Sequence, residues 1–234
     1  EFPQCYRYSE RWLTLFSESP ESISLHPVEY LKGLHKLLNA LFNTLQYQRF
    51  CEIMKMLEDF PKHYDMSKNK NIEGLYYLFW YIHQIKVHFL QGTFTEGIVL
   101  VKPLMKIIDE DTYYWDNRRV LVFYYRIACL YFGSGNNSKA IDYLNLIINQ
   151  KNPDYREDIQ SFARILNLIA HFELGNRQLV EYQVKSVYRF LAKQEELNEV
   201  QKEIFYFIRK TPRIRTDELQ VEFKRLKEKL SSLE

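Results

Sequence analysis

The segment YYRIACLYFGSGNNSKAIDYL, residues 124–144, sets two apolar stretches on either side of a short polar turn. Before the turn, Tyr124, Ile127 and Tyr131 recur at spacings of three and four, which places them on one face of an α-helix. The apolar residues after the turn keep the same spacing. Between the stretches stands Gly135, and a glycine there can take the left-handed conformation that ends a helix. The segment predicts two antiparallel amphipathic helices joined by a tight turn.

A phenylalanine at position 132 precedes this turn, and three other segments align on the same residue. They are FNTLQYQRF, FLQGTFTEG and FELGNRQLV, which begin at Phe42, Phe89 and Phe172. Apolar residues stand four positions before, and 12 and 15 positions after, each of these phenylalanines. The turn glycine is present in every segment except the first, which has Leu45. This recurrence, at periods of 47, 43 and 40 residues, predicts helix pairs that bury their apolar faces by stacking on one another.

The predicted helices follow from these alignments. First helices are expected over 27–44, 71–90, 115–133 and 156–174, and second helices over 47–59, 95–108, 137–149 and 177–193. Pro103 falls inside one of the second helices and should kink it. We expect one α-solenoid domain over residues 1–234, with an N-terminal helix within 1–22, about four helix pairs over 27–193 and a closing helix pair over 194–234.

The third pair resembles the tetratricopeptide repeat, whose pattern it matches in order and spacing at Tyr124, Ile127, Ala128, Tyr131, Gly135 and Ala140. The other pairs depart from that pattern, with polar residues at Gln84, Arg164 and Asn167 where the family has apolar ones. Their periods also exceed the family's usual length, so heat-repeat-like and other helical-pair solenoids remain open. The resemblance, over about residues 30–193, implies an all-α, right-handed α-α superhelix whose concave face holds a peptide or a partner's helix. It implies no catalytic residues.

Composition and motifs indicate no cofactor or metal chemistry. The net charge is +2 with both signs interspersed, which makes nucleic acid an improbable general partner, and no apolar run approaches the length of a membrane span. Three widely spaced cysteines argue against a disulfide framework and a zinc site, and favour the cytoplasm. His88 and His171 occupy one repeat position and are expected to be half-buried packing residues. We therefore do not expect an enzyme.

Two sets of residues are candidates for partner binding. If the tetratricopeptide geometry holds, the first helices present an apolar groove strip, and the alternative is that a tighter superhelix buries the same residues between repeats. The strip comprises Ile82, Lys86, Phe89, Tyr125, Cys129, Phe132, Phe162, Ile169 and Phe172. The second set is a basic cluster that could contact a polyanion, or be ordinary charge at a helix end, and comprises Arg209, Lys210, Arg213 and Arg215.

These observations predict a non-catalytic scaffold that binds a peptide or partner helix of another protein, of unspecified identity and oligomeric state, through a concave helical-repeat surface. The alternative is a nucleic-acid-associated or regulatory helical-repeat protein that uses the basic cluster. Salt-dependent retention on a polyanion would separate the two.

Overall fold

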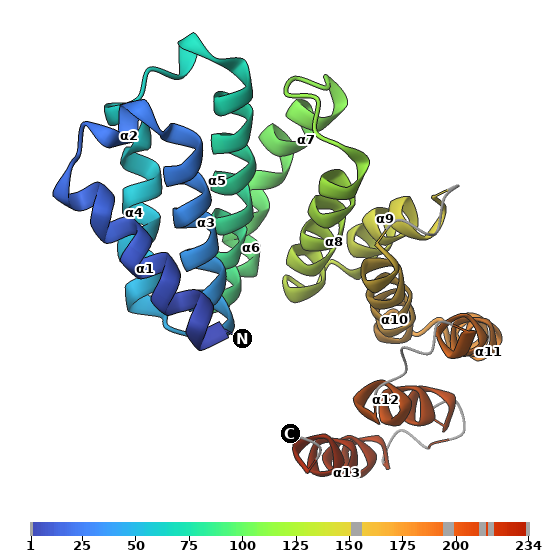
Figure 1. Cartoon of the computed structure of the whole chain (residues 1–234). Coiled ribbons are helices and arrows are strands. Elements are labelled where there is room, and N and C mark those ends of the chain that lie inside the picture. Colours follow the sequence, from blue (N-terminus) through green and yellow to red (C-terminus); the bar gives the residue numbers. More distant parts are fainter. Residues whose placement is uncertain (1, 151–155, 194–198, 211–213, 215–217, 233–234) are drawn as a thin grey trace. The chain divides into compact units, whose positions relative to one another are not determined.

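The computed structural model describes residues 2–150, 156–193, 199–210, 214 and 218–232, and these form helices and turns without a β-strand (Figure 1). The all-α class is therefore confirmed over this part of the chain. Contacts between Cα atoms divide the chain into two compact units, Glu1–Arg126 and Ile127–Glu234, and the division falls within one helix, α8.

The helices of unit 1 are α1 (Phe2–Glu18), α2 (Ser22–Leu25), α3 (Pro27–Asn43), α4 (Tyr47–His63), α5 (Lys70–Gln91), α6 (Phe94–Gly97) and α7 (Val101–Asp109), with 3₁₀ turns η1 (Met66–Lys68) and η2 (Ile98–Leu100). Helix α8 (Asn117–Gly133) leads into unit 2, which continues with α9 (Asn137–Ile148), α10 (Glu157–Glu173), α11 (Arg177–Lys193), α12 (Glu199–Lys210) and α13 (Leu219–Ser231). Helices stand at the expected positions with ends shifted by a few residues, except over 95–108, where the segment is divided.

The four aligned turns share one backbone geometry. In each turn, a backbone amide four positions after the aligned phenylalanine donates to the carbonyl of the residue just before that phenylalanine. Examples are Asn136 N to Tyr131 O at 2.9 Å and Gln46 N to Leu41 O at 3.0 Å. The three turn glycines have left-handed φ angles of 70°, 82° and 76°. Leu45 takes the same conformation with φ 55° although it carries a Cβ. The periodic alignment therefore identifies a structural repeat.

The second helix of the second pair differs from the expected continuous helix over 95–108. The segment is divided into α6, the 3₁₀ turn η2 and α7, and Pro103 is the third residue of α7. Proline has no amide hydrogen and its ring clashes with the carbonyl four residues earlier, here that of Val99 in η2. The helix is thus interrupted by a 3₁₀ turn just before the proline.

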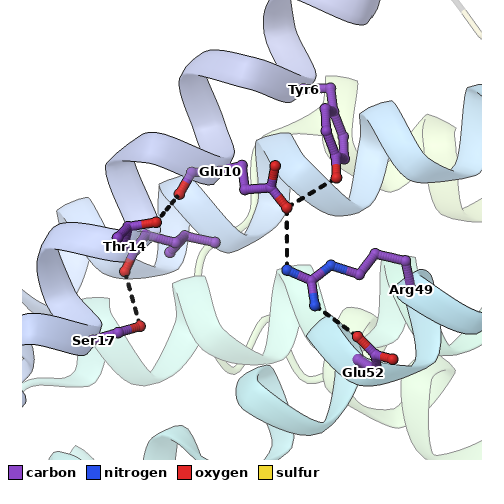
Figure 2. Close-up of polar contacts among 7 residues, drawn as sticks. Tyr6, Glu10, Thr14, Ser17, Arg49 and Glu52 are labelled. Atoms are coloured by element: carbon purple, nitrogen blue, oxygen red, sulfur yellow. Dashed lines mark hydrogen bonds and ion pairs between the residues drawn. The ribbon is translucent and has the colours of Figure 1, made fainter.

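Helix α3 lies at the centre of unit 1 and packs against α1, α4 and α5. Its Leu31, Leu34 and Leu38 are completely buried, and each such side chain contributes about 1.5–3 kcal/mol of transfer free energy. Helix α1 is also attached to α4 by polar contacts (Figure 2). The Glu10 carboxylate accepts hydrogen bonds from the Tyr6 hydroxyl at 2.9 Å and from the Arg49 guanidinium at 3.1 Å.

Unit 2 has its own apolar core, formed by α10, α11 and α12. Val180, Val184 and Leu191 of α11 pack there with Phe205 and Phe207 of α12. The ring of Phe207 lies 4.7 Å from that of Phe223 on α13, so the closing helices cover the last repeat. The core joins residues on both sides of the interval 194–198 and fixes α12 against α11.

Candidate functional site: a cationic groove in unit 2

The residues of the expected groove strip differ in how deeply they are buried. Phe162 is 46% exposed, whereas Lys86 is buried at 4%. The other members are half-buried: Ile82, Phe89, Tyr125, Cys129, Phe132, Ile169 and Phe172. Ile169 and Phe172 pack against the apolar core of unit 2, and the Phe172 ring lies 6.5 Å from that of Phe223 on α13. In unit 2 the closing helix therefore covers part of the strip.

Lys86 belongs to a buried polar chain between α3 and α5. Its ammonium donates to Asn39 Oδ1 and lies 4.4 Å from the Phe42 ring centroid. Asn39 Nδ2 lies 3.0 Å from His35 Nε2, and His35 Nδ1 lies 2.9 Å from His83 Nε2. Since the lysine can only donate, Asn39 must turn its amide hydrogens to His35, which then carries its own hydrogen on Nδ1. Hydrogen-bond donation along these side chains therefore runs in one direction, from Lys86 to Asn39, then to His35 and then to His83.

Burial sets the ionisation of this chain. Desolvation, followed by the positive charges of Lys86 and Arg126, lowers the pKa of His35 to about 3. Desolvation, then the neighbouring His35, lowers the pKa of His83 well below its ordinary value. Burial and the Arg126 charge lower the pKa of Lys86 to about 7. Because Lys86 is enclosed in this way, it is not placed to line a binding surface.

Residues of α11 and α12 line a groove with a volume of about 350 Å³. Val184 and the buried Phe205 give it apolar walls, and Tyr188 packs edge-on against Phe205 with ring centroids 6.2 Å apart. Tyr188 and Tyr206 are 49% and 53% exposed. Four basic side chains complete the lining, and they are Lys185, Arg189, Lys202 and Arg209. We call this site the cationic groove.

The charges of the cationic groove are largely available to a ligand. No acidic side chain is among its lining residues. Lys202 bonds Glu199 at 2.7 Å, and that hydrogen bond raises the lysine pKa. Within the described ranges, Lys185, Arg189 and Arg209 make no ion pair. The guanidinium carbon of Arg209 lies 5.9 Å from the Tyr206 ring centroid, at a distance suited to a cation–π contact.

The structure separates the members of the expected basic cluster. Arg209 lines the cationic groove, but Lys210 turns to α13, where it bonds Glu222 at 3.2 Å. Arg213 and Arg215 lie outside the described residues. Sequence reasoning missed Lys185, Arg189 and Lys202 because they lie on α11 and early in α12. The spacing of Lys185, Tyr188 and Arg189, at three and four residues, was the available signal for one shared helix face.

The expected packing histidines are confirmed. Both are half-buried, and each bonds a side chain of its own repeat turn: His88 Nδ1 lies 2.8 Å from Thr93 Oγ1, and His171 Nδ1 lies 3.1 Å from Asn176 Nδ2. Over the described ranges, His, Cys, Asp and Glu side chains nowhere gather in a group of three that could hold a metal ion.

Two polar residues that depart from the tetratricopeptide pattern, Arg164 and Gln84, have contacts with nearby side chains or backbone. Arg164 lies over the Phe190 ring at 3.9 Å and bonds the Gln160 carbonyl at 3.1 Å. Gln84 donates to the Glu58 carboxylate at 2.6 Å.

Comparison of the chain with protein-family models, curated proteins and solved structures gives no significant match. Among the helices described, none is both long and apolar enough to cross a membrane.

Proposed function

We propose that the chain is a non-catalytic interaction module, a right-handed helical-repeat superhelix of the tetratricopeptide type, that binds an acidic segment of another protein in the cationic groove. The observation that supports this most strongly is the combination of four basic side chains and two exposed tyrosines around an apolar floor. Carboxylates of a ligand would pair with the cations, and an apolar or aromatic side chain between them would lie against Phe205.

The size and charge of the site favour a short acidic protein segment. Its volume of about 350 Å³ lies near the lower end of ligand pockets, which span roughly 300–1,000 Å³. The neighbouring acids Glu199 and Glu203 pair with Lys202 and Lys229, so they offset part of the positive charge beside the groove. A long nucleic acid gains most from an extended basic track.

A single-stranded nucleic acid is the second candidate, because exposed tyrosines beside arginine and lysine provide stacking surfaces for bases. The alternative of a nucleic-acid-associated or regulatory protein is therefore retained. Its binding site would be the cationic groove of α11 and α12 instead of the whole basic cluster. Its affinity would fall steeply with salt and would not depend on an apolar side chain in the ligand.

Fluorescence anisotropy with labelled probes tests the proposal. The probes are a short peptide of Asp and Glu around one Phe, the same peptide with Asn and Gln for the acids, and single-stranded oligouridine. We expect the acidic peptide to bind more tightly than either other probe. Arg189→Glu/Arg209→Glu should weaken its binding roughly tenfold or more, because two attractive charges become repulsive.

The matched control is Lys224→Glu/Lys227→Glu, which makes the same change in net charge at exposed positions of α13 in the same unit. It should leave the affinity within roughly twofold. Equal weakening by both double variants would mean that only net charge matters and would reject a groove. Tighter binding of oligouridine than of the acidic peptide would reject the protein-binding function in favour of the nucleic-acid one.

A further inference from the structure

A second surface, in unit 1, has features that the cationic groove does not explain. Helix α1 presents Tyr8, Trp12 and Leu15 on one face, at spacings of four and three, with exposed fractions of 75%, 46% and 59%. Helix α1 therefore carries an apolar face on the outside of the unit.

Trp12 is held in place on this face by α3. The indole lies across the backbone of Gly33, so closely that a Cβ at that glycine would stand 2.8 Å from Trp12 Cδ1. The indole nitrogen donates to the Glu29 carbonyl at 3.4 Å. The ring also lies 6.4 Å from Phe16, which packs edge-on with Tyr30 in the core. Trp12 is therefore a rigid aromatic side chain that stays half-exposed.

Two adjoining pockets of about 360 and 320 Å³ share Trp12 as a common wall. The first is mainly apolar, with Leu15 and Phe16 among its lining residues. Tyr8, Lys32 and Lys36 line the second. An apolar pocket next to a basic one, separated by a fixed aromatic ring, suits an apolar side chain and a carboxylate that lie about one helical turn apart.

The basic side chains of this surface line the second pocket. Lys32 and Lys36 are exposed, and neither pairs with an acid in the part of the chain that the structure describes. Glu29 is the acid shared by the two pockets. Of the other acids of α1, Glu10 is turned to Arg49 on α4 (Figure 2), and Glu18 is exposed next to Ser19 of the first pocket. The second pocket, with Lys32 and Lys36, therefore complements carboxylates of a partner, and the first complements an apolar side chain.

We propose that the α1–α3 face is a second binding site, which takes an amphipathic helix of another protein with an apolar anchor for the Leu15–Phe16 pocket and acidic residues for Lys32 and Lys36. This site is separate from the cationic groove and does not depend on its function. The partner helix would lie across Trp12, so that one turn occupies each pocket.

Four model helices of about 16 residues test the proposal, since shorter ones are marginal in water. Three share one leucine stripe flanked by Glu, by Lys or by Gln, and the fourth has the Glu flanks with serine for leucine. Binding is followed by anisotropy with the full chain carrying Arg189→Glu/Arg209→Glu, which removes competition from the cationic groove. We expect the Glu-flanked leucine helix to bind and the serine helix to fail.

Charge reversal then locates the site. Lys32→Glu/Lys36→Glu should weaken the Glu-flanked helix roughly tenfold and favour the Lys-flanked one. The control Lys55→Glu/Lys68→Glu changes the charge of unit 1 equally at exposed positions elsewhere and should have little effect. Leu15→Ser, at an exposed position, should also weaken binding without loss of helical circular dichroism.

Equal binding of the Glu- and Lys-flanked helices, equal effects of the two charge reversals, or no binding of any helix would overturn the proposal. Sedimentation that shows a dimer abolished by Leu15→Ser would overturn it in favour of a second copy of the chain as the occupant. Loss of acidic-peptide binding in the cationic groove would leave this result unaffected, because the two sites are tested with different variants.

Discussion

Acid should destabilise unit 1 through the buried chain Lys86–Asn39–His35–His83. His35 Nε2 and His83 Nε2 both accept hydrogen bonds in this chain, so protonation would place two donors face to face as well as bury a charge. The pKa of His35 is about 3 in the folded protein and 6.5 for a solvent-exposed histidine, so between these values the unfolded chain binds more protons and stability falls as the pH falls. At pH 4 the loss from His35 alone is about 3 kcal/mol, at 1.36 kcal/mol per pKa unit.

Urea unfolding at pH 7 and pH 4, with hydrogen exchange of the α3 and α5 amides, measures this loss. His35→Phe keeps a ring to stack on Phe79, whose centroid lies 4.0 Å from that of His35, and removes the titration. We expect this variant to lose about 3 kcal/mol less than the wild type between the two pH values. His63→Gln, at an exposed position, should change the difference little. The reasoning is refuted if wild type and His35→Phe lose the same free energy of unfolding.

Two further predictions concern the turns and the buried lysine. Gly135→Ala should lower the free energy of unfolding in urea by about 1 kcal/mol, because alanine disfavours the left-handed conformation. Leu45→Gly should be neutral or stabilising. Similar losses from both variants would contradict a shared turn geometry. The pKa of Lys86 is about 7 in the folded protein and 10.5 for a solvent-exposed lysine, so above pH 7 the unfolded chain binds more protons than the folded one. The wild-type free energy of unfolding should therefore rise by about 2 kcal/mol from pH 7 to pH 9. Lys86→Met should abolish that rise in the same assay, and a rise that survives would show that the lysine does not cause it.

The repeats could be predicted from the sequence because each depends on short-range spacing. The phenylalanine before each turn and the apolar residues on either side set two helices within about forty residues. Leu45 takes the left-handed conformation although leucine disfavours it, so the turn geometry does not require a glycine. The break before Pro103 was also predictable from the lack of an amide hydrogen, but its division into a 3₁₀ turn and a new helix was not.

The sites could not be predicted because they depend on which helix faces meet. Spacing places Ile82, Lys86 and Phe89 on one side of a helix, but it does not say whether another helix covers that side. Asn39, the hydrogen-bond partner of the buried lysine head group, is 47 residues away from Lys86 in sequence. The cationic groove likewise joins Lys185 and Arg209 from different helices through the packing of Phe205, which periodicity does not describe.

The position of Trp12 has a consequence for spectroscopy. Trp115 is buried at 8% exposure and donates to the Gly74 carbonyl at 3.1 Å, whereas Trp12 is 46% exposed on the α1–α3 face. An exposed indole emits at longer wavelength and is accessible to dissolved quenchers, while a buried one is protected from them. Once the half-buried third tryptophan, Trp80, is replaced by phenylalanine, the protein carries one fluorophore on this outer face and an internal reference in Trp115. Occupation of the face can then be followed by iodide quenching without a label.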